Sequence, residues 1–276
     1  MNPSLSCYPS DLALNFCVYA ADNAVLDSAR GFAAELKVEL FSHEHLKDPY
    51  QLDYPYVFVY QDTQAFIIQT GKSAPGPVTA SFLQGKTTHR LKFGGGKGQM
   101  IAKAVGLNKG VTPSILDATA GLAQDAFVLA SLACEVTLLE RSPIIAELIK
   151  SALLESEGTE VHDITARMNL KRVDACTWLA EQKDKVADVI YLDPMYPHRD
   201  KSSLVKKEMR LFHTLVGESS DDALLLELAL EKARYRVVVK RPRKGETIQG
   251  KAPSHQILGK SCRYDIYAIQ RLENLK

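Results

Sequence analysis

Residues 114–130 read SILDATAGLAQDAFVLA, and this stretch decides the fold. The apolar run at 114–116 predicts a strand, the mostly small residues at 117–123 predict a tight turn, and residues 125–132 predict a helix. Small side chains let the backbone of a turn approach a bound molecule closely, and Gly121 can adopt a positive φ. We therefore expect an α/β sheet with a ligand-binding turn after this strand.

Strands and helices alternate beyond this stretch. Strands are predicted at 135–139, 170–173, 186–192, 236–239 and 264–269, and helices at 143–154, 177–182, 204–215 and 223–233. Ser142 is the expected N-cap of the helix that starts at Pro143. The alternation predicts a doubly wound, mostly parallel sheet, and ligands bind beyond the carboxyl ends of the strands in such sheets.

The first 80 residues have a different pattern from the rest of the chain. The β-rich runs at 56–60 and 65–69 are separated by a short polar turn, which predicts a hairpin. Residues 72–77 read KSAPGP, a breaker-rich segment typical of a linker. We therefore expect a small β-rich N-terminal region at 1–80 and the main domain at 81–276.

The composition excludes several classes of protein. The chain has 276 residues, 46% of them hydrophobic, and a formal net charge of +1. No apolar run reaches the roughly 20 residues that a membrane-spanning helix needs, and the N-terminus does not read as a signal peptide. Five scattered cysteines form no CxxC pair and no Cys/His metal spacing, so we expect no metal, no membrane and a cytoplasmic location.

Carboxylates at three predicted strand ends suggest the cofactor. Asp117 suits a ligand with an ammonium group, and Glu140, 23 residues later, can accept hydrogen bonds from two ribose hydroxyls. Asp174 can accept a hydrogen bond from an adenine amino group. The turn at 117–125 has only one glycine, so it does not match the pattern that binds a dinucleotide pyrophosphate. S-adenosylmethionine (SAM) carries all three groups, although an ordinary turn and a solvated Glu140 remain alternative interpretations.

Residues 189–196, VIYLDPMY, carry the predicted chemistry. Asp193 and the carbonyl of Pro194 can each accept one N–H of an exocyclic base amine, whose lone pair is delocalised into the ring. These acceptors would stabilise the positive charge that develops on the amine as a methyl group arrives. Tyr196 can stack on the base. The pattern is similar to the [DN]-P-P-[YFW] motif of methyltransferases that act on conjugated amines.

Several strings together resemble one family, the ribosomal RNA small subunit methyltransferase J family. They are KFGGGKG at 92–98, LDATAGL at 116–122, LER at 139–141, YLDPMYPH at 191–198, LVKKEMR at 204–210 and VVVKRP at 237–242. The resemblance covers roughly residues 85–270. It implies a Rossmann-like SAM-dependent methyltransferase fold and methylation of a guanine N2 in 16S ribosomal RNA. The cofactor contacts that it implies are Gln124, Asp125, Glu140, Arg141, Asp174, Ala175 and Asp193.

Basic residues near these strings are candidate RNA contacts, although each group could also be a solvated face. They are Lys92, Lys97, His198, Lys207, Arg210, Lys240 and Arg241. The expected partner is 16S ribosomal RNA, either as naked RNA or in the small ribosomal subunit. Two alternatives stay open at this point. One is an amine methyltransferase for another RNA or DNA base or for a protein glutamine, and the other is a non-catalytic RNA-binding protein on the same scaffold.

Overall fold

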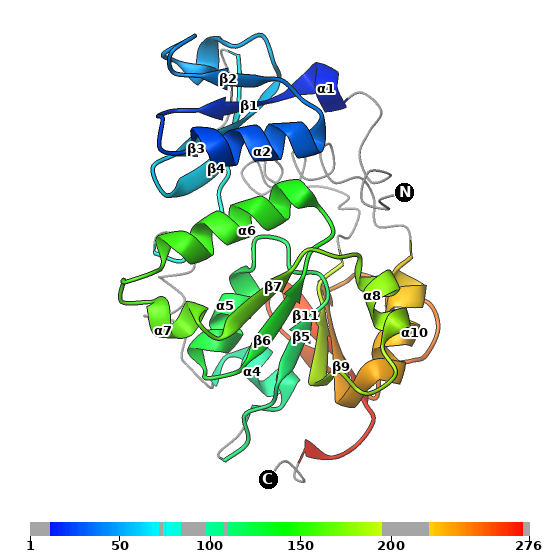
Figure 1. Cartoon of the computed structure of the whole chain (residues 1–276). Helices are drawn as coiled ribbons and strands as arrows, with labels where there is room; N and C mark the ends of the chain where they lie inside the picture. Colours follow the sequence, from blue (N-terminus) through cyan, green and yellow to red (C-terminus); the bar gives the residue numbers. More distant parts are fainter. Residues whose placement is uncertain are drawn as a thin grey trace. The chain divides into compact units, whose positions relative to one another are not determined.

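The computed structural model describes residues 12–71, 74, 76–83, 98–107, 110–194 and 221–272. The chain divides into two compact units, which are considered separately. Unit 1 contains residues up to Ala80 together with Glu147–Glu155, and unit 2 contains Ser81–Ala146, Ser156–His198 and Ser219–Lys276. Most elements of both units are labelled in Figure 1.

Unit 2 is built on a seven-stranded sheet with the order β10-β11-β9-β8-β5-β6-β7. The five strands from β9 to β7 in this order are parallel to one another, and β11 and β10 are antiparallel. Their bounds are β5 Ile115–Asp117, β6 Val136–Leu139, β7 Met168–Lys171, β8 Ala187–Leu192, β9 Ala233–Pro242, β10 His255–Leu258 and β11 Cys262–Ala268. The predicted parallel-dominated sheet is therefore confirmed.

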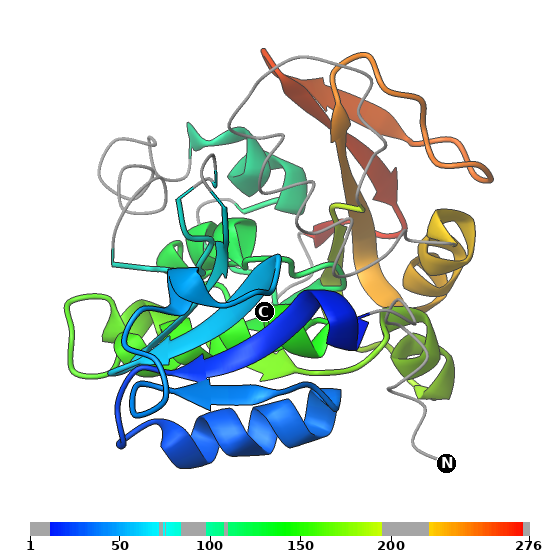
Figure 2. The same ribbon diagram turned by 90° about the horizontal axis from the view of Figure 1, so that it is seen from above.

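Helices cover both faces of this sheet. They are α4 Met100–Val105, α5 Gln124–Ser131, α7 His162–Thr165, α8 Ala175–Glu181 and α10 Asp222–Lys232. Helix α6, Pro143–Glu155, begins in unit 2, and its residues Glu147–Glu155 belong to unit 1. Helices α8 and α10 lie side by side in both views (Figures 1 and 2). Ile190 and Leu192 of β8 and Val237 and Val239 of β9 share one buried cluster with these two helices. Because side chains alternate along a strand, the residues between them point to the opposite face, toward α5.

Strand β9 contains one residue more than its partner at the start of their pairing. Ala233 pairs with Ala187, and the next pair is Arg236 with Val189. The two pairs are three residues apart along β9 but only two residues apart along β8. Such a bulge changes which residues of the following strand face each side of the sheet. Beyond it the pairing is regular to Val239 opposite Leu192.

Unit 1 contains a four-stranded sheet with the order β2-β1-β3-β4. Its elements are α1 Leu12–Asn15, β1 Phe16–Ala20, α2 Leu26–Leu36, β2 Leu40–Ser42, a 3-10 turn at Pro49–Gln51, β3 Tyr56–Gln61 and β4 Gln64–Gln69. The predicted hairpin is confirmed, since β3 and β4 pair antiparallel around a turn in which Asp62 has a φ of 51°. The sequence did not predict α2 or the parallel pairing of β1 with β2 and β3.

Some sequence predictions lie outside the described residues, among them the helix expected at 204–215, half of the linker and most of the 92–98 string. No described helix is both long enough and apolar enough to cross a membrane. The predicted strand at 170–173 is shifted, because β7 begins at Met168 and ends at Lys171 in register with β6.

Candidate active site

The candidate site lies where the strand order of the large sheet reverses. β5 pairs with β6 on one side and with β8 on the other. Doubly wound sheets bind ligands at such a point, beyond the carboxyl ends of the strands. Asp117 is the last residue of β5, and Asp193 directly follows the last residue of β8. The topology therefore brings these two predicted site residues to the same edge of the sheet.

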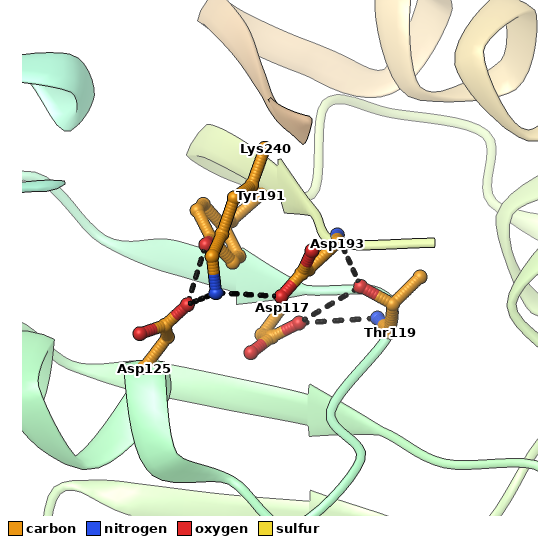
Figure 3. Close-up of polar contacts among 6 residues, drawn as sticks. All are labelled: Asp117, Thr119, Asp125, Tyr191, Asp193 and Lys240. Atoms are coloured by element: carbon orange, nitrogen blue, oxygen red, sulfur yellow. Dashed lines mark hydrogen bonds and ion pairs between the residues drawn. The ribbon is translucent and has the colours of Figure 1, made fainter. Parts of the chain in front are cut away.

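Thr119 joins the loops that follow these two strands, as Figure 3 shows. The backbone N–H of Asp193 donates to Oγ1 of Thr119 at 2.6 Å, and the backbone N–H of Thr119 donates to Oδ1 of Asp117 at 3.1 Å. Asp117 is buried. One threonine thus holds together the predicted cofactor turn and the predicted catalytic loop. No local pattern distinguishes Thr119 from the other small residues of the turn.

A lysine from β9 lies between two carboxylates at this edge (Figure 3). Nζ of Lys240 is 2.7 Å from Oδ2 of Asp125 and 2.8 Å from Oδ2 of Asp193. The hydroxyl of Tyr191 donates to the same oxygen of Asp125 at 2.7 Å. Asp125 of α5, Asp193 after β8 and Lys240 of β9 therefore form one connected network.

The alternation of side chains explains how these groups meet. Tyr191 lies between Ile190 and Leu192, which pack toward α8 and α10, so its ring points to the face that α5 covers. Lys240 follows Val239 in β9 and points the same way for the same reason. Asp125 is in the first turn of α5, and its carboxylate meets both side chains there.

The site carries more negative than positive charge. Burial, followed by the nearby carboxylates of Asp125 and Asp193, raises the pKa of Asp117 to about 7 against the opposing hydrogen bond from Thr119. Burial also raises the pKa of Asp193, while Lys240 lowers it. Burial lowers the pKa of Lys240 itself, but the two carboxylates outweigh burial and raise it above its ordinary value. A charged ammonium thus contacts the carboxylates of Asp125 and Asp193, and the carboxyl group of Asp117 lies nearby.

Glu140 connects the second strand to the cofactor turn. Its Oε2 accepts the backbone N–H of Gly121 at 3.1 Å, and its Oε1 accepts that of Ser142 at 2.8 Å. Burial raises the pKa of Glu140 to about 7, and these two hydrogen bonds oppose that shift. Because a carboxylate can accept about four hydrogen bonds, the group retains capacity for a ligand hydroxyl. Ser142 also caps α6 as predicted, since its Oγ accepts the N–H of Ile145 at 3.4 Å.

The remaining predicted cofactor residues differ in exposure. Gly121 adopts a φ of 51°, the positive value that its position predicted. Gln124 is exposed at the first position of α5, and Arg141 is half-buried between β6 and α6. Asp174 is exposed and caps α8, its Oδ1 accepting the N–H of Thr177 at 2.9 Å, and Ala175 is the first residue of that helix.

Two of the predicted RNA contacts are placed differently by the structure. Lys240 contacts Asp125 and Asp193, and Arg241 is buried with 6% of its surface exposed. Nε of Arg241 donates to the carbonyl of Glu246 at 3.0 Å. Both residues lie within β9, which extends to Pro242, so they are not loop cations that point to solvent. The structure therefore places both side chains in contacts within the protein, which differs from the predicted contact with RNA phosphate.

Other predicted site residues lie outside the described part of the chain. They are Lys92, Lys97, Tyr196, His198, Lys207 and Arg210. Pro194, the last described residue of the catalytic string, is buried. Among the described residues, no group of three or more His, Cys, Asp or Glu side chains is arranged to hold a metal ion.

The sequence is similar to proteins of one kind. The model of the "Putative SAM-dependent methyltransferase" family matches residues 42–269. A ribosomal RNA small subunit methyltransferase J of Ectopseudomonas mendocina is 54% identical over 208 residues, which cover 75% of this chain and 80% of the relative. The protein of the same name from Cellvibrio japonicus is 49% identical over 227 residues, which cover 80% of this chain and 85% of the relative.

A crystal structure provides an independent comparison. A SAM-dependent methyltransferase of Neisseria gonorrhoeae has a TM-score of 0.68 and 32% sequence identity. The match covers 91% of this chain and 95% of that one. The similarity in sequence and the similarity in structure thus extend over most of the chain and include the candidate site.

Proposed function

This chain belongs to the ribosomal RNA small subunit methyltransferase J family, and from that premise we propose that it methylates the exocyclic N2 amine of one guanosine in 16S ribosomal RNA. It is a SAM-dependent enzyme that acts on ribosomal RNA. The choice of guanine N2 rests on the family resemblance and on the chemistry of Asp193. The substrate is 16S RNA, free or in the small subunit, and the proposed location is the cytoplasm.

One observation carries the assignment of the catalytic loop. Asp193 follows β8 at the reversal of strand order, and its backbone is hydrogen-bonded to Thr119 of the turn after β5. A carboxylate fixed there faces the position where a cofactor bound to the turn would present its methyl group. Positioning of the two reactants is the main requirement of such a transfer.

The residues at this edge fit SAM. The excess of carboxylates at Asp117, Asp125 and Asp193 is complementary to a ligand that carries a sulfonium and an ammonium group. Glu140 is placed beside the same turn with capacity to accept ribose hydroxyls. When bound, SAM supplies an electrophilic methyl group to the acceptor amine. We assign Gln124, Arg141, Asp174 and Ala175 to the rim of this cofactor site.

The chain's own groups would act on the amine. One oxygen of Asp193 and the carbonyl of Pro194 each accept one N–H, which directs the nitrogen lone pair away from the ring and toward the methyl group. The same acceptors stabilise the positive charge that grows on nitrogen as the bond forms. The proton that the methylated amine then releases can pass along its hydrogen bond to Asp193. Tyr196 stays assigned to stacking on the base.

A labelling experiment tests the substrate assignment. Purified 16S RNA and small ribosomal subunits, both from cells that lack this protein, are incubated with the enzyme and labelled SAM. We expect mass spectrometry of the nucleosides to find N2-methylguanosine in at least one of the two substrates. Label only in adenosine, in DNA or in protein glutamine would contradict the proposal.

The cofactor assignment predicts a loss of SAM affinity when Glu140 is replaced by alanine. The ribose hydroxyls would lose a charged acceptor, which is worth about 1–3 kcal/mol. Isothermal titration calorimetry should therefore show a Kd roughly 5–150-fold higher. Glu135→Ala is the matched control. Glu135 is an exposed carboxylate that directly precedes β6, whereas Glu140 directly follows it. Equal affinity in the parent and in Glu140→Ala would exclude a ribose contact at Glu140.

A further inference from the structure

Lys240 has a place in the site that neither the family resemblance nor the predicted chemistry explains. Its ammonium contacts the carboxylate of the catalytic loop at 2.8 Å and that of α5 at 2.7 Å (Figure 3). We propose that Lys240 is a positioning residue for methyl transfer, which holds Oδ2 of Asp193 so that Oδ1 can accept the substrate amine. The expected effect on kcat rests on the proposed function, whereas the expected effect on the titration of Asp193 does not.

The network around Lys240 is anchored at one end in β8 and at the other end by the residue that follows β8. Tyr191 is fully buried in β8, and its hydroxyl holds Asp125. Asp125 in turn contacts Lys240, and Lys240 contacts Asp193, which is two residues beyond Tyr191. A closed chain of four charged or polar groups leaves the Asp193 carboxylate few orientations, because each partner is itself anchored.

Lys240 is also placed to determine the charge of Asp193. Burial raises the pKa of Asp193, Lys240 and Arg241 lower it, and the neighbouring carboxylate of Asp125 raises it. Only the ionised form offers Oδ1 as a full acceptor to both the amine and the developing positive charge. The described charged or titratable groups that act on Asp193 include Lys240 and Arg241 from β9, Asp125 from α5, Asp117 from β5 and Tyr191 from β8. Tyr264 from β11 acts on Tyr191.

The variant Lys240→Met tests this inference by its pH profile. Without the ammonium, Asp193 has a higher pKa, so the acidic limb of kcat against pH should move to higher pH. At neutral pH kcat should fall roughly tenfold or more, the effect of losing one hydrogen bond between charged groups. The KM for RNA should stay at the parent value. Lys240→Arg retains the charge and should return the acidic limb toward its position in the parent.

Arg234→Met provides a matched control from the same two strands. Arg234 is also a cation of β9 paired with a carboxylate of β8, since its guanidinium is 2.7 Å from Asp188 at the other end of the sheet. Its loss removes a comparable ion pair far from the site. The pH profile of Arg234→Met should therefore coincide with that of the parent.

A second measurement does not depend on any RNA substrate. Carboxyl ¹³C NMR of the protein alone follows the titration of Asp193, with the resonance assigned by its loss in Asp193→Asn. We expect Asp193 to titrate at higher pH in Lys240→Met than in the parent. If this shift occurs while the parent methylates no RNA, the positioning role stands and the proposed function fails.

Two outcomes would overturn the inference. One is an Asp193 titration that is the same in the parent and in Lys240→Met. The other is a normal kcat in Lys240→Met combined with a higher KM for RNA and a weaker dependence of RNA affinity on salt. The second result would identify Lys240 as a phosphate contact, because each lost phosphate contact reduces that dependence.

Discussion

Replacement of Asp193 by alanine is expected to lower kcat about 100-fold or more. The variant lacks the acceptor that stabilises the charge developing on the amine, and the loss of one such preorganised group typically has this size. The loop should keep its place, because the hydrogen bond to Oγ1 of Thr119 comes from the backbone N–H of residue 193 and not from its side chain. Single-turnover measurements of methyl transfer to RNA would give the rate.

The matched control for this prediction is Asp184→Ala. Asp184 is an exposed carboxylate just before β8, at the end of the strand opposite to Asp193. Its removal should leave kcat unchanged. A turnover of Asp193→Ala within a few-fold of the parent would show that the amine is bound elsewhere, and the proposed catalytic loop would then be wrong.

Replacement of Asp265 by alanine is expected to cost about 3–5 kcal/mol of unfolding free energy. Asp265 is completely buried in β11, and it accepts Nε of Arg263 at 2.8 Å and Nη2 at 3.1 Å. Gln256 of β10 donates to the same carboxylate at 2.7 Å. The loss of the Asp265 carboxylate would leave the buried guanidinium of Arg263 without its counter-ion. Equilibrium unfolding in urea would measure the change.

An exposed pair of the same chemistry is the control for stability. Asp27 and Arg30 of α2 are 2.7 Å apart, but most of both side chains is exposed. Ion pairs in solvent contribute little, so Asp27→Ala should unfold almost like the parent. If Asp265→Ala loses no more stability than Asp27→Ala, the buried pair is not a major stabilising element of this sheet.

The local patterns of the sequence were sufficient to predict the sheet edge that carries the site. The apolar run before Asp193, the small residues after Asp117 and the Ser-Pro start of α6 are short-range features, and each predicted its element within about two residues. The carboxylates at the strand ends follow directly from those boundaries. Local sequence predicts such features well because the residues that determine them are neighbours in the chain.

The lysine network could not be predicted in the same way. The predicted strand ended at residue 239, whereas β9 continues to Pro242, so Lys240 and Arg241 were interpreted as cations of a loop. Within a strand, the side chains of two adjacent residues point to opposite faces of the sheet. Lys240 points to the α5 face and contacts Asp125, and Arg241 points to the α10 face, 3.7 Å from Asp222. An ionisable residue directly after three valines was the one local feature that could have suggested a buried partner.

Two elements that depend on contacts between residues far apart in the chain, β10 and α2, were also not predicted from the sequence. β10 has mostly exposed side chains and is defined by its antiparallel register with β11. Helix α2 begins without a side-chain N-cap, so the usual start pattern is absent. In both cases tertiary contacts and not local composition determine the structure.

The regular pairing that follows the extra residue of β9 constrains how this gene can change. Deleting one residue of the regularly paired segment from Arg236 to Val239 would reverse the phase of the strand, so that the lysine would face α10 and the arginine would face α5. Substitutions in the valine run alter only packing, but a single-codon insertion or deletion exchanges the two cations. Among homologous genes, this segment should therefore tolerate variation in its side chains and resist variation in its length.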